Sequence, residues 1–306
     1  MCSSTLGENY GIQEINCHIN FSEPFDDIVT MLLTRGANPN WVTKNCCRSL
    51  LPFSSSYSGN DTLFPLMSAA CGNTDVPVQL LLRAGANIKQ TNSVGQTALH
   101  GRCHIVCGDY SNDILKTLLS QSPDVHLEDV FGRTPLHYAC QHATLEVVSY
   151  LLEAGAQLNI VDRSGFTELE LAAQSYTDPY LKVKRLTESY SYPNQMIIEV
   201  YETVAWYLAR AGKSSLECIG KATSMRKEHN IPKILSQPVE CYGFTKEWEA
   251  MKDLELHRNS REELEIQGMI ARERIYKGRH TTKLLLDNLD FQCMHTKICT
   301  YTLSIL

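Results

Sequence analysis

Internal repetition constrains this chain of 306 residues more than any other feature. A phrase that runs from Asn92 to His100 returns from Asp129 to His137 and, in part, from Asp162 to Leu169. The copies follow one another at about 33 residues, with one longer interval. Repetition at such a period is typical of solenoids, in which neighbouring units stack and bury one continuous core.

Each unit predicts one turn followed by two short helices. Thr134 directly before Pro135 is typical of a helix start, because threonine caps the first turn and proline fits its first position. Gly155 is typical of a helix end, where a residue in the left-handed conformation is needed. Between these two points the apolar residues recur at helical spacing. They are Val147, Val148, Leu151 and Leu152.

The phrase Thr134-Pro135-Leu136-His137-Tyr138-Ala139 resembles the signature of the ankyrin repeat. The resemblance covers residues 23–174, apart from an irregular stretch at about 44–60 that we interpret as an insertion or a degenerate unit. It implies an all-α fold, an ankyrin-repeat solenoid whose concave surface binds proteins or peptides.

The repeat is lost after residue 174. Residues 175–194 are polar and rich in turn formers, so we predict a linker there. Apolar stripes at helical spacing then predict a helical-hairpin module, similar to tetratricopeptide repeats, at 195–278. Residues 1–22 are an N-terminal segment, and residues 279–306 are a tail without a matching repeat.

Two segments of the second half carry a more specific resemblance. Tyr242–Trp248 and Gly268–Ile275 are similar to segments of the Fem (feminization-1) family of ankyrin proteins. Proteins of that family are substrate receptors of cullin-2 RING ubiquitin ligases, which also contain elongin, and they bind degrons at substrate C-termini. The resemblance implies a non-catalytic protein that recognises substrates for ubiquitination and proteasomal degradation.

The resemblance to the Fem family ends near Ile275. The chain is shorter than members of that family at both ends, and nothing after Ile275 resembles a cullin-binding box. We therefore expect it to bind a peptide partner without assembling a ligase by itself. The alternative is a generic ankyrin scaffold, adaptor or regulator without a link to ubiquitin, which the repeats alone would support.

Four acidic residues near the predicted turn tips are candidates for peptide binding. In one interpretation their carboxylates attract basic peptide termini, as the resemblance to the Fem family implies. In the other, the two at the usual turn position, Asp129 and Asp162, hydrogen-bond their own loops. The four candidates are Asp124, Glu128, Asp129 and Asp162.

Other chemistry finds little support in the sequence. His100, Cys103, His104 and Cys107 fall close together, but a single short helix cannot turn four ligands inward, so we expect no metal. No phosphate-binding, metalloprotease or hydrolase motif is present, so we expect neither catalysis nor a cofactor. The run from Arg272 to Arg274 is either a paired structural surface or a docking site for a partner.

Composition excludes several classes of partner. The chain has 28 basic and 34 acidic residues and a net charge of −6, which argues against binding to nucleic acid or anionic membranes. No apolar run approaches the ~18 residues of a membrane span, and no secretory signal is evident. We therefore expect a cytoplasmic protein, with the nucleus as the alternative, whose 12 cysteines are free thiols.

Overall fold

The computed structural model describes residues 25–42, 62–104, 112–175, 177–210, 215–233, 270 and 274–275. This part of the chain is helical, as predicted, and it contains an isolated β-bridge between Val161 and Thr167. No helix among these residues has the length and apolar character that crossing a membrane requires. The helices are α1 Phe25–Thr34, α2 Pro65–Ala70, α3 Val76–Arg83, α4 Ala98–His104, α5 Asp113–Ser120, α6 Pro135–His142, α7 Leu145–Glu153, α8 Glu168–Ala173, α9 Pro179–Ser189, α10 Asn194–Arg210 and α11 Leu216–Glu228.

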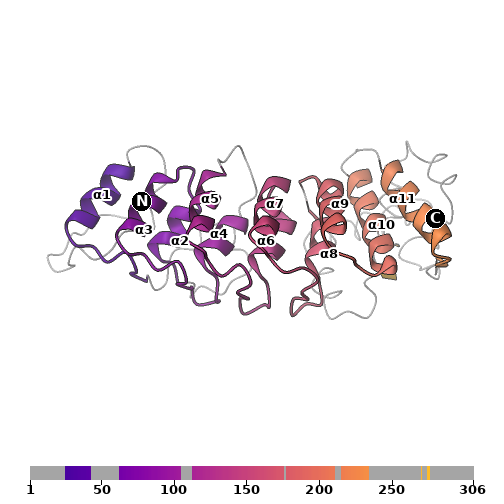
Figure 1. Cartoon of the computed structure of the whole chain (residues 1–306), viewed down its shortest axis with the longest axis horizontal. Helices are drawn as coiled ribbons and strands as arrows, with labels where there is room; N and C mark the ends of the chain where they lie inside the picture. Colours follow the sequence, from indigo (N-terminus) through magenta and orange to yellow (C-terminus); the bar gives the residue numbers. More distant parts are fainter. Residues whose placement is uncertain are drawn as a thin grey trace, which may run out of the picture. The chain divides into compact units, whose positions relative to one another are not determined.

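The chain divides into two compact units, unit 1 (residues 1–157) and unit 2 (residues 158–306). In unit 1, helices of one repeat pack together as the pairs α2–α3, α4–α5 and α6–α7. Equivalent helices of successive repeats also stack, α2 on α4, α4 on α6, and α3 on α5. Figure 1 shows this order, with α5 and α7 above α4 and α6. The all-α solenoid predicted from the repeat is therefore confirmed.

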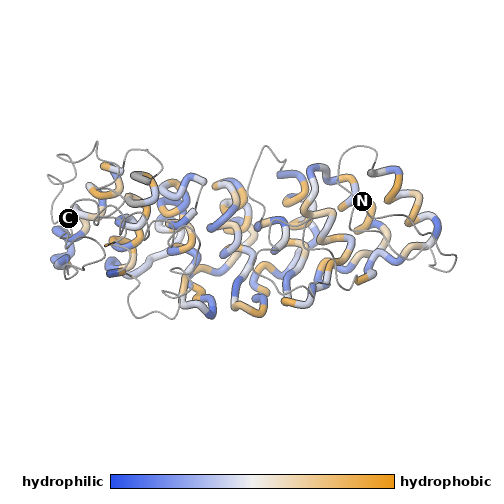
Figure 2. Tube along the Cα trace, turned by 180° about the vertical axis from the view of Figure 1, so that it is seen from behind, coloured by the Kyte–Doolittle hydropathy of each residue, from blue (hydrophilic) through white to orange (hydrophobic). Residues whose placement is uncertain are grey.

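Stacking buries the apolar positions of the repeated phrases. The core of unit 1 includes Leu66, Leu81 and Leu118, which are 0%, 2% and 0% exposed. Helices α3 and α7 end at a glycine, as the sequence predicts: Gly85, at φ +87°, lets Ala86 N–H donate to the Leu81 carbonyl at 2.9 Å. Figure 2 shows hydrophobic and hydrophilic residues alternating along the helices, as expected when each helix buries one face.

In unit 2, α8 and α9 pack together, and α10 contacts α8, α9 and α11. Helix α8 begins like the first helices of unit 1. Thr167 is its N-cap and accepts a hydrogen bond from Glu170 N–H, while the Glu170 carboxylate accepts one from Thr167 N–H. Glutamate takes the place that histidine has in the other two copies, and it completes the same capping box.

The predicted linker at 175–194 is wrong in its centre, because Pro179–Ser189 form helix α9. Its buried face consists of Pro179, Val183 and Leu186, together with Lys182, which is 0% exposed. The Lys182 ammonium donates to Ser175 Oγ at 2.6 Å and to Thr177 Oγ1 at 2.9 Å. A lysine at a buried position interrupts the apolar stripe, and for that reason the helix was missed.

Several predicted segments lie outside the described residues. These are the N-terminal segment 1–22, the insertion at 44–60, most of the predicted helical-hairpin module after residue 233, and the tail 279–306.

Candidate protein-binding surface

The turn of each repeat is built on one side chain that accepts two backbone hydrogen bonds. Asp129 Oδ1 accepts from the N–H groups of Phe131 and Arg133 at 2.8 and 3.0 Å. Asn92 and Asp162 make the same pair of bonds in their own turns, at 2.8–3.1 Å. Short polar side chains at this position hold the loop in a single conformation.

Asp129 also joins two repeats through its second oxygen. Asp129 Oδ2 accepts from the Tyr138 hydroxyl at 2.6 Å and from Gln96 Nε2, which belongs to the preceding repeat, at 3.2 Å. Gln96 Nε2 also donates to the Tyr138 hydroxyl at 2.9 Å. The three polar groups form a closed network inside unit 1.

Two of the four predicted peptide-binding residues are therefore structural. Asp129 and Asp162 are 4% and 3% exposed, and their carboxylates are used by the turns. The interpretation as turn formers describes both, and a buried carboxylate is not accessible to a peptide. The structure places Asp129 in unit 1 and Asp162 in unit 2, each in its own turn.

The other two candidates, Asp124 and Glu128, are exposed. Asp124 Oδ1 accepts from His126 N–H at 2.9 Å, which leaves its second oxygen toward solvent or a partner. Between Asp129 and Gly132 the turn carries Val130 and Phe131, each 40% exposed. We call Asp124, Glu128, Val130 and Phe131 the tip surface of unit 1.

Val130 and Phe131 are not among the binding residues predicted from the sequence, because that prediction rested on charged residues near the turn tips. The sequence does contain a signal for them: two large apolar residues stand next to one another in a turn that otherwise consists of polar residues. Exposed apolar side chains next to one another mark interaction sites more reliably than single ones do.

The tip surface is held rigidly against the preceding repeat. Val130 N–H donates to the Val94 carbonyl at 2.9 Å. The two turns approach so closely that a Cβ on Gly95 would lie 3.3 Å from Asp129 Cα, and Gly95 itself has φ +80°. A larger residue at Gly95 would strain its own backbone and push the next turn away.

Histidines of the repeat signature hold the first helices and link the repeats. His100 Nδ1 accepts from Thr97 N–H at 3.1 Å, and its Nε2–H donates to the Arg133 carbonyl of the next repeat at 3.2 Å. His100 therefore joins its own helix start to the loop of the next repeat. Burial lowers the pKa of His100 to about 4, although Asp129 and backbone carbonyls act in the opposite direction.

A second histidine, His104, packs among aromatic rings. Its ring centroid lies 5.0 Å from that of Tyr138 and 4.4 Å from that of His142. Burial lowers the pKa of His104 to about 2, and the nearby His142 and Arg133 add to the effect. Within the described ranges, no group of three or more His, Cys, Asp or Glu side chains is placed to hold a metal ion.

The comparisons with known proteins agree on the class of fold. The family profile "Ankyrin repeats (3 copies)" matches residues 103–196. The chain therefore contains ankyrin repeats, stacked as the helices of unit 1 are stacked.

Individual relatives match less than half of the chain. Transient receptor potential cation channel subfamily A member 1 of Drosophila melanogaster is 32% identical over 123 residues, 39% of this chain and 10% of the relative. Neurogenic locus notch homolog protein 1 of Mus musculus is 36% identical over 132 residues, 38% of this chain and 5% of the relative. An ankyrin repeat and KH domain-containing protein of Caenorhabditis briggsae is 34% identical over 113 residues, 35% of this chain and 4% of the relative. The chain spans a tenth or less of the length of each.

Removing the Asp129 carboxylate tests the structural role of the turn network. Asp129→Ala withdraws the acceptor from two backbone N–H groups, the Tyr138 hydroxyl and the Gln96 amide, so we expect a loss of about 2–3 kcal/mol in the free energy of unfolding. Asp129→Asn should cost only about 1 kcal/mol, because Asn92 makes the same two backbone bonds with an amide oxygen. Urea unfolding followed by circular dichroism measures both, and equal losses would show that the negative charge matters more than the bonds.

Proposed function

We propose that the chain is a non-catalytic protein that binds a protein or peptide partner through the tip surface of unit 1. The observation that carries the proposal is the pair Val130 and Phe131, each 40% exposed at the end of a turn. Leaving this area in water costs free energy, at about 25 cal/mol for each Å² of apolar surface that a partner would cover. Aromatic residues that enter a partner's pocket commonly dominate such interfaces.

The rigidity of the turn supports the same proposal. Asp129 fixes the N–H groups of Phe131 and Arg133, and the Val130 N–H is bonded to the preceding repeat. A partner would therefore meet a preformed loop and lose little free energy in ordering it. The exposed carboxylates of Asp124 and Glu128 beside the apolar pair favour a partner with basic groups around an apolar residue, and they would mainly raise the association rate.

A finer proposal is that the chain is a substrate-recognition subunit of a cullin-2 RING ubiquitin ligase. Its support is the resemblance of Tyr242–Trp248 and Gly268–Ile275 to the Fem family. A generic ankyrin scaffold or adaptor is the second candidate, and the variety of proteins that share the repeats supports it. Copurification with cullin-2 and elongin from cells that express the tagged chain, either directly or through a full-length Fem protein, distinguishes the two, because a generic adaptor would capture neither.

The tip surface is tested by quantitative capture of partners on the immobilised chain. Phe131→Ala should reduce capture of the main partner about tenfold or more, since truncating an interface anchor commonly costs 2 kcal/mol or more. Val161→Ala in unit 2 is the matched control, because Val161 is also an exposed apolar residue, at 58%. The proposal fails if no variant of the tip surface loses a partner. In that case Phe131→Ala, Val130→Ala and the variants of Asp124 and Glu128 would all capture the same partners as the unmodified chain.

A further inference from the structure

Ile275, far along the chain, packs on the ankyrin part of unit 2. It forms a small apolar cluster with Phe166, which closes the turn before α8, and with Leu171 of α8. The three side chains are 9%, 4% and 2% exposed. More than a hundred residues therefore separate the two sides of this contact in the sequence, and both sides belong to the same unit.

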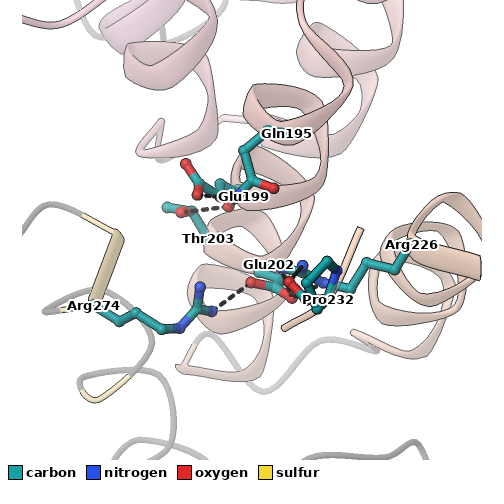
Figure 3. Close-up of polar contacts among 7 residues, drawn as sticks. All are labelled: Gln195, Glu199, Glu202, Thr203, Arg226, Pro232 and Arg274. Atoms are coloured by element: carbon teal, nitrogen blue, oxygen red, sulfur yellow. Dashed lines mark hydrogen bonds and ion pairs between the residues drawn. The ribbon is translucent and has the colours of Figure 1, made fainter. Parts of the chain in front are cut away.

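The residue before it, Arg274, is held by a carboxylate of α10. Arg274 Nη2 donates to Glu202 Oε2 at 2.6 Å, and both side chains are nearly buried, at 11% and 13% exposed. The other oxygen, Oε1, accepts from Nε and Nη2 of Arg226 on α11 at 3.1 and 3.0 Å. Figure 3 shows Glu202 between the two arginines, which approach it from opposite sides.

Comparison with the neighbouring repeat shows what is unusual at this place. Phe166 and Leu171 occupy the repeat positions of Arg133 and Tyr138 in unit 1. There, the Arg133 guanidinium lies 5.7 Å from the centre of the Tyr138 ring, and both residues also make hydrogen bonds. In unit 2 both positions are apolar, so their side chains leave water by packing against another apolar side chain. Ile275 provides this contact.

We propose that Phe166, Leu171 and Glu202 form a peptide-docking site in unit 2, and that the chain's own Arg274–Ile275 pair occupies it as an intramolecular ligand. The apolar cluster receives the aliphatic side chain, and the carboxylate receives the basic one. The ligand class that fits is a segment with a basic residue directly before an aliphatic residue. This site is independent of the tip surface, which belongs to unit 1.

Occupation in cis controls access to the site. A tethered segment is present at an effective concentration that reaches the millimolar range for short linkers. A partner with the same basic–aliphatic pair must compete with that concentration, so the unmodified chain should bind such a partner weakly. Release of the Arg274–Ile275 segment should expose the site.

The test uses the full chain and a fluorescein-labelled synthetic peptide with the sequence of Gly268–Lys277. Fluorescence anisotropy should show that the double variant Arg274→Glu/Ile275→Asp binds this peptide at least tenfold more tightly than the unmodified chain. The peptide with the same two substitutions should not bind. Leu181→Asp is the matched control, because Leu181 is an exposed residue of unit 2, and this variant should bind the peptide as weakly as the unmodified chain.

A milder double variant, Arg274→Gln/Ile275→Ala, guards against simple unfolding. Both double variants should keep the helical circular dichroism of the chain, and at least one should bind the peptide. If both lose their helical signal, Ile275 is an ordinary part of the core and the proposal is overturned. It is also overturned if no folded double variant binds the peptide better than the unmodified chain does.

Discussion

Replacing Glu202 by glutamine is expected to destabilise unit 2 by about 3–5 kcal/mol. The Glu202 carboxylate is the acceptor for Arg226 on one oxygen and for Arg274 on the other. Its side chain is 13% exposed, and those of the arginines are 10% and 11% exposed, so little water can replace the carboxylate. The substitution keeps the shape but removes the negative charge that the two guanidinium groups share.

The same substitution one turn earlier provides the control. Glu199 also lies on α10 and accepts a hydrogen bond from Gln195, but this contact is exposed. Glu199→Gln should change the free energy of unfolding by no more than about 0.5 kcal/mol. Urea unfolding curves of the two variants measure the difference. Equal effects would mean that solvent screens the Glu202 cluster as it screens a surface pair.

Most of unit 1 could be predicted because the signals that form it are local. The helix caps at Thr134 and Gly155 and the apolar stripe between them lie within one repeat. Similar signals recur in the other repeats. The helix α9 was missed for the opposite reason. Lys182 stands at a buried position of that helix, and its partners Ser175 and Thr177 satisfy it only once the chain before the helix has folded back.

The candidate sites were less predictable because burial decides the role of each residue. Asp129 and Glu128 are adjacent acidic residues, yet one closes a buried network and the other is exposed. The contact between Arg274 and Glu202 joins residues 72 positions apart, and no pattern within either segment announces the other. The interpretation of Arg274 as a paired residue agrees with this contact. Only the structure identifies Glu202 as its partner.

Acidification from pH 7 to pH 5 is expected to destabilise unit 1 by about 4 kcal/mol, about half of it from His100 and half from His104. Burial lowers the pKa of these imidazoles to about 4 and about 2. In the unfolded chain each would titrate near the ordinary value of about 6.5. The folded state therefore excludes protons that the unfolded state binds.

The direction of this pH effect follows from the protonation state of the histidines that the folded chain requires. His100 Nδ1 accepts a hydrogen bond from Thr97 N–H, so a proton on that nitrogen would break the bond. His104 lies beside His142 and near Arg133, and a second positive charge there would be repelled. Stability is thus fully present above about pH 6.5 and is lost as the pH falls below it, by up to about 1.4 kcal/mol per pH unit for each group.

Urea midpoints measured at pH 7 and pH 5 test this expectation. His104→Gln should remove about half of the difference between the two pH values, because glutamine does not titrate. His126→Gln is the matched control for the replacement of a histidine, because His126 is an exposed residue of unit 1. A difference that persists in full after His104→Gln would locate the acid sensitivity elsewhere, with His100 as the next candidate.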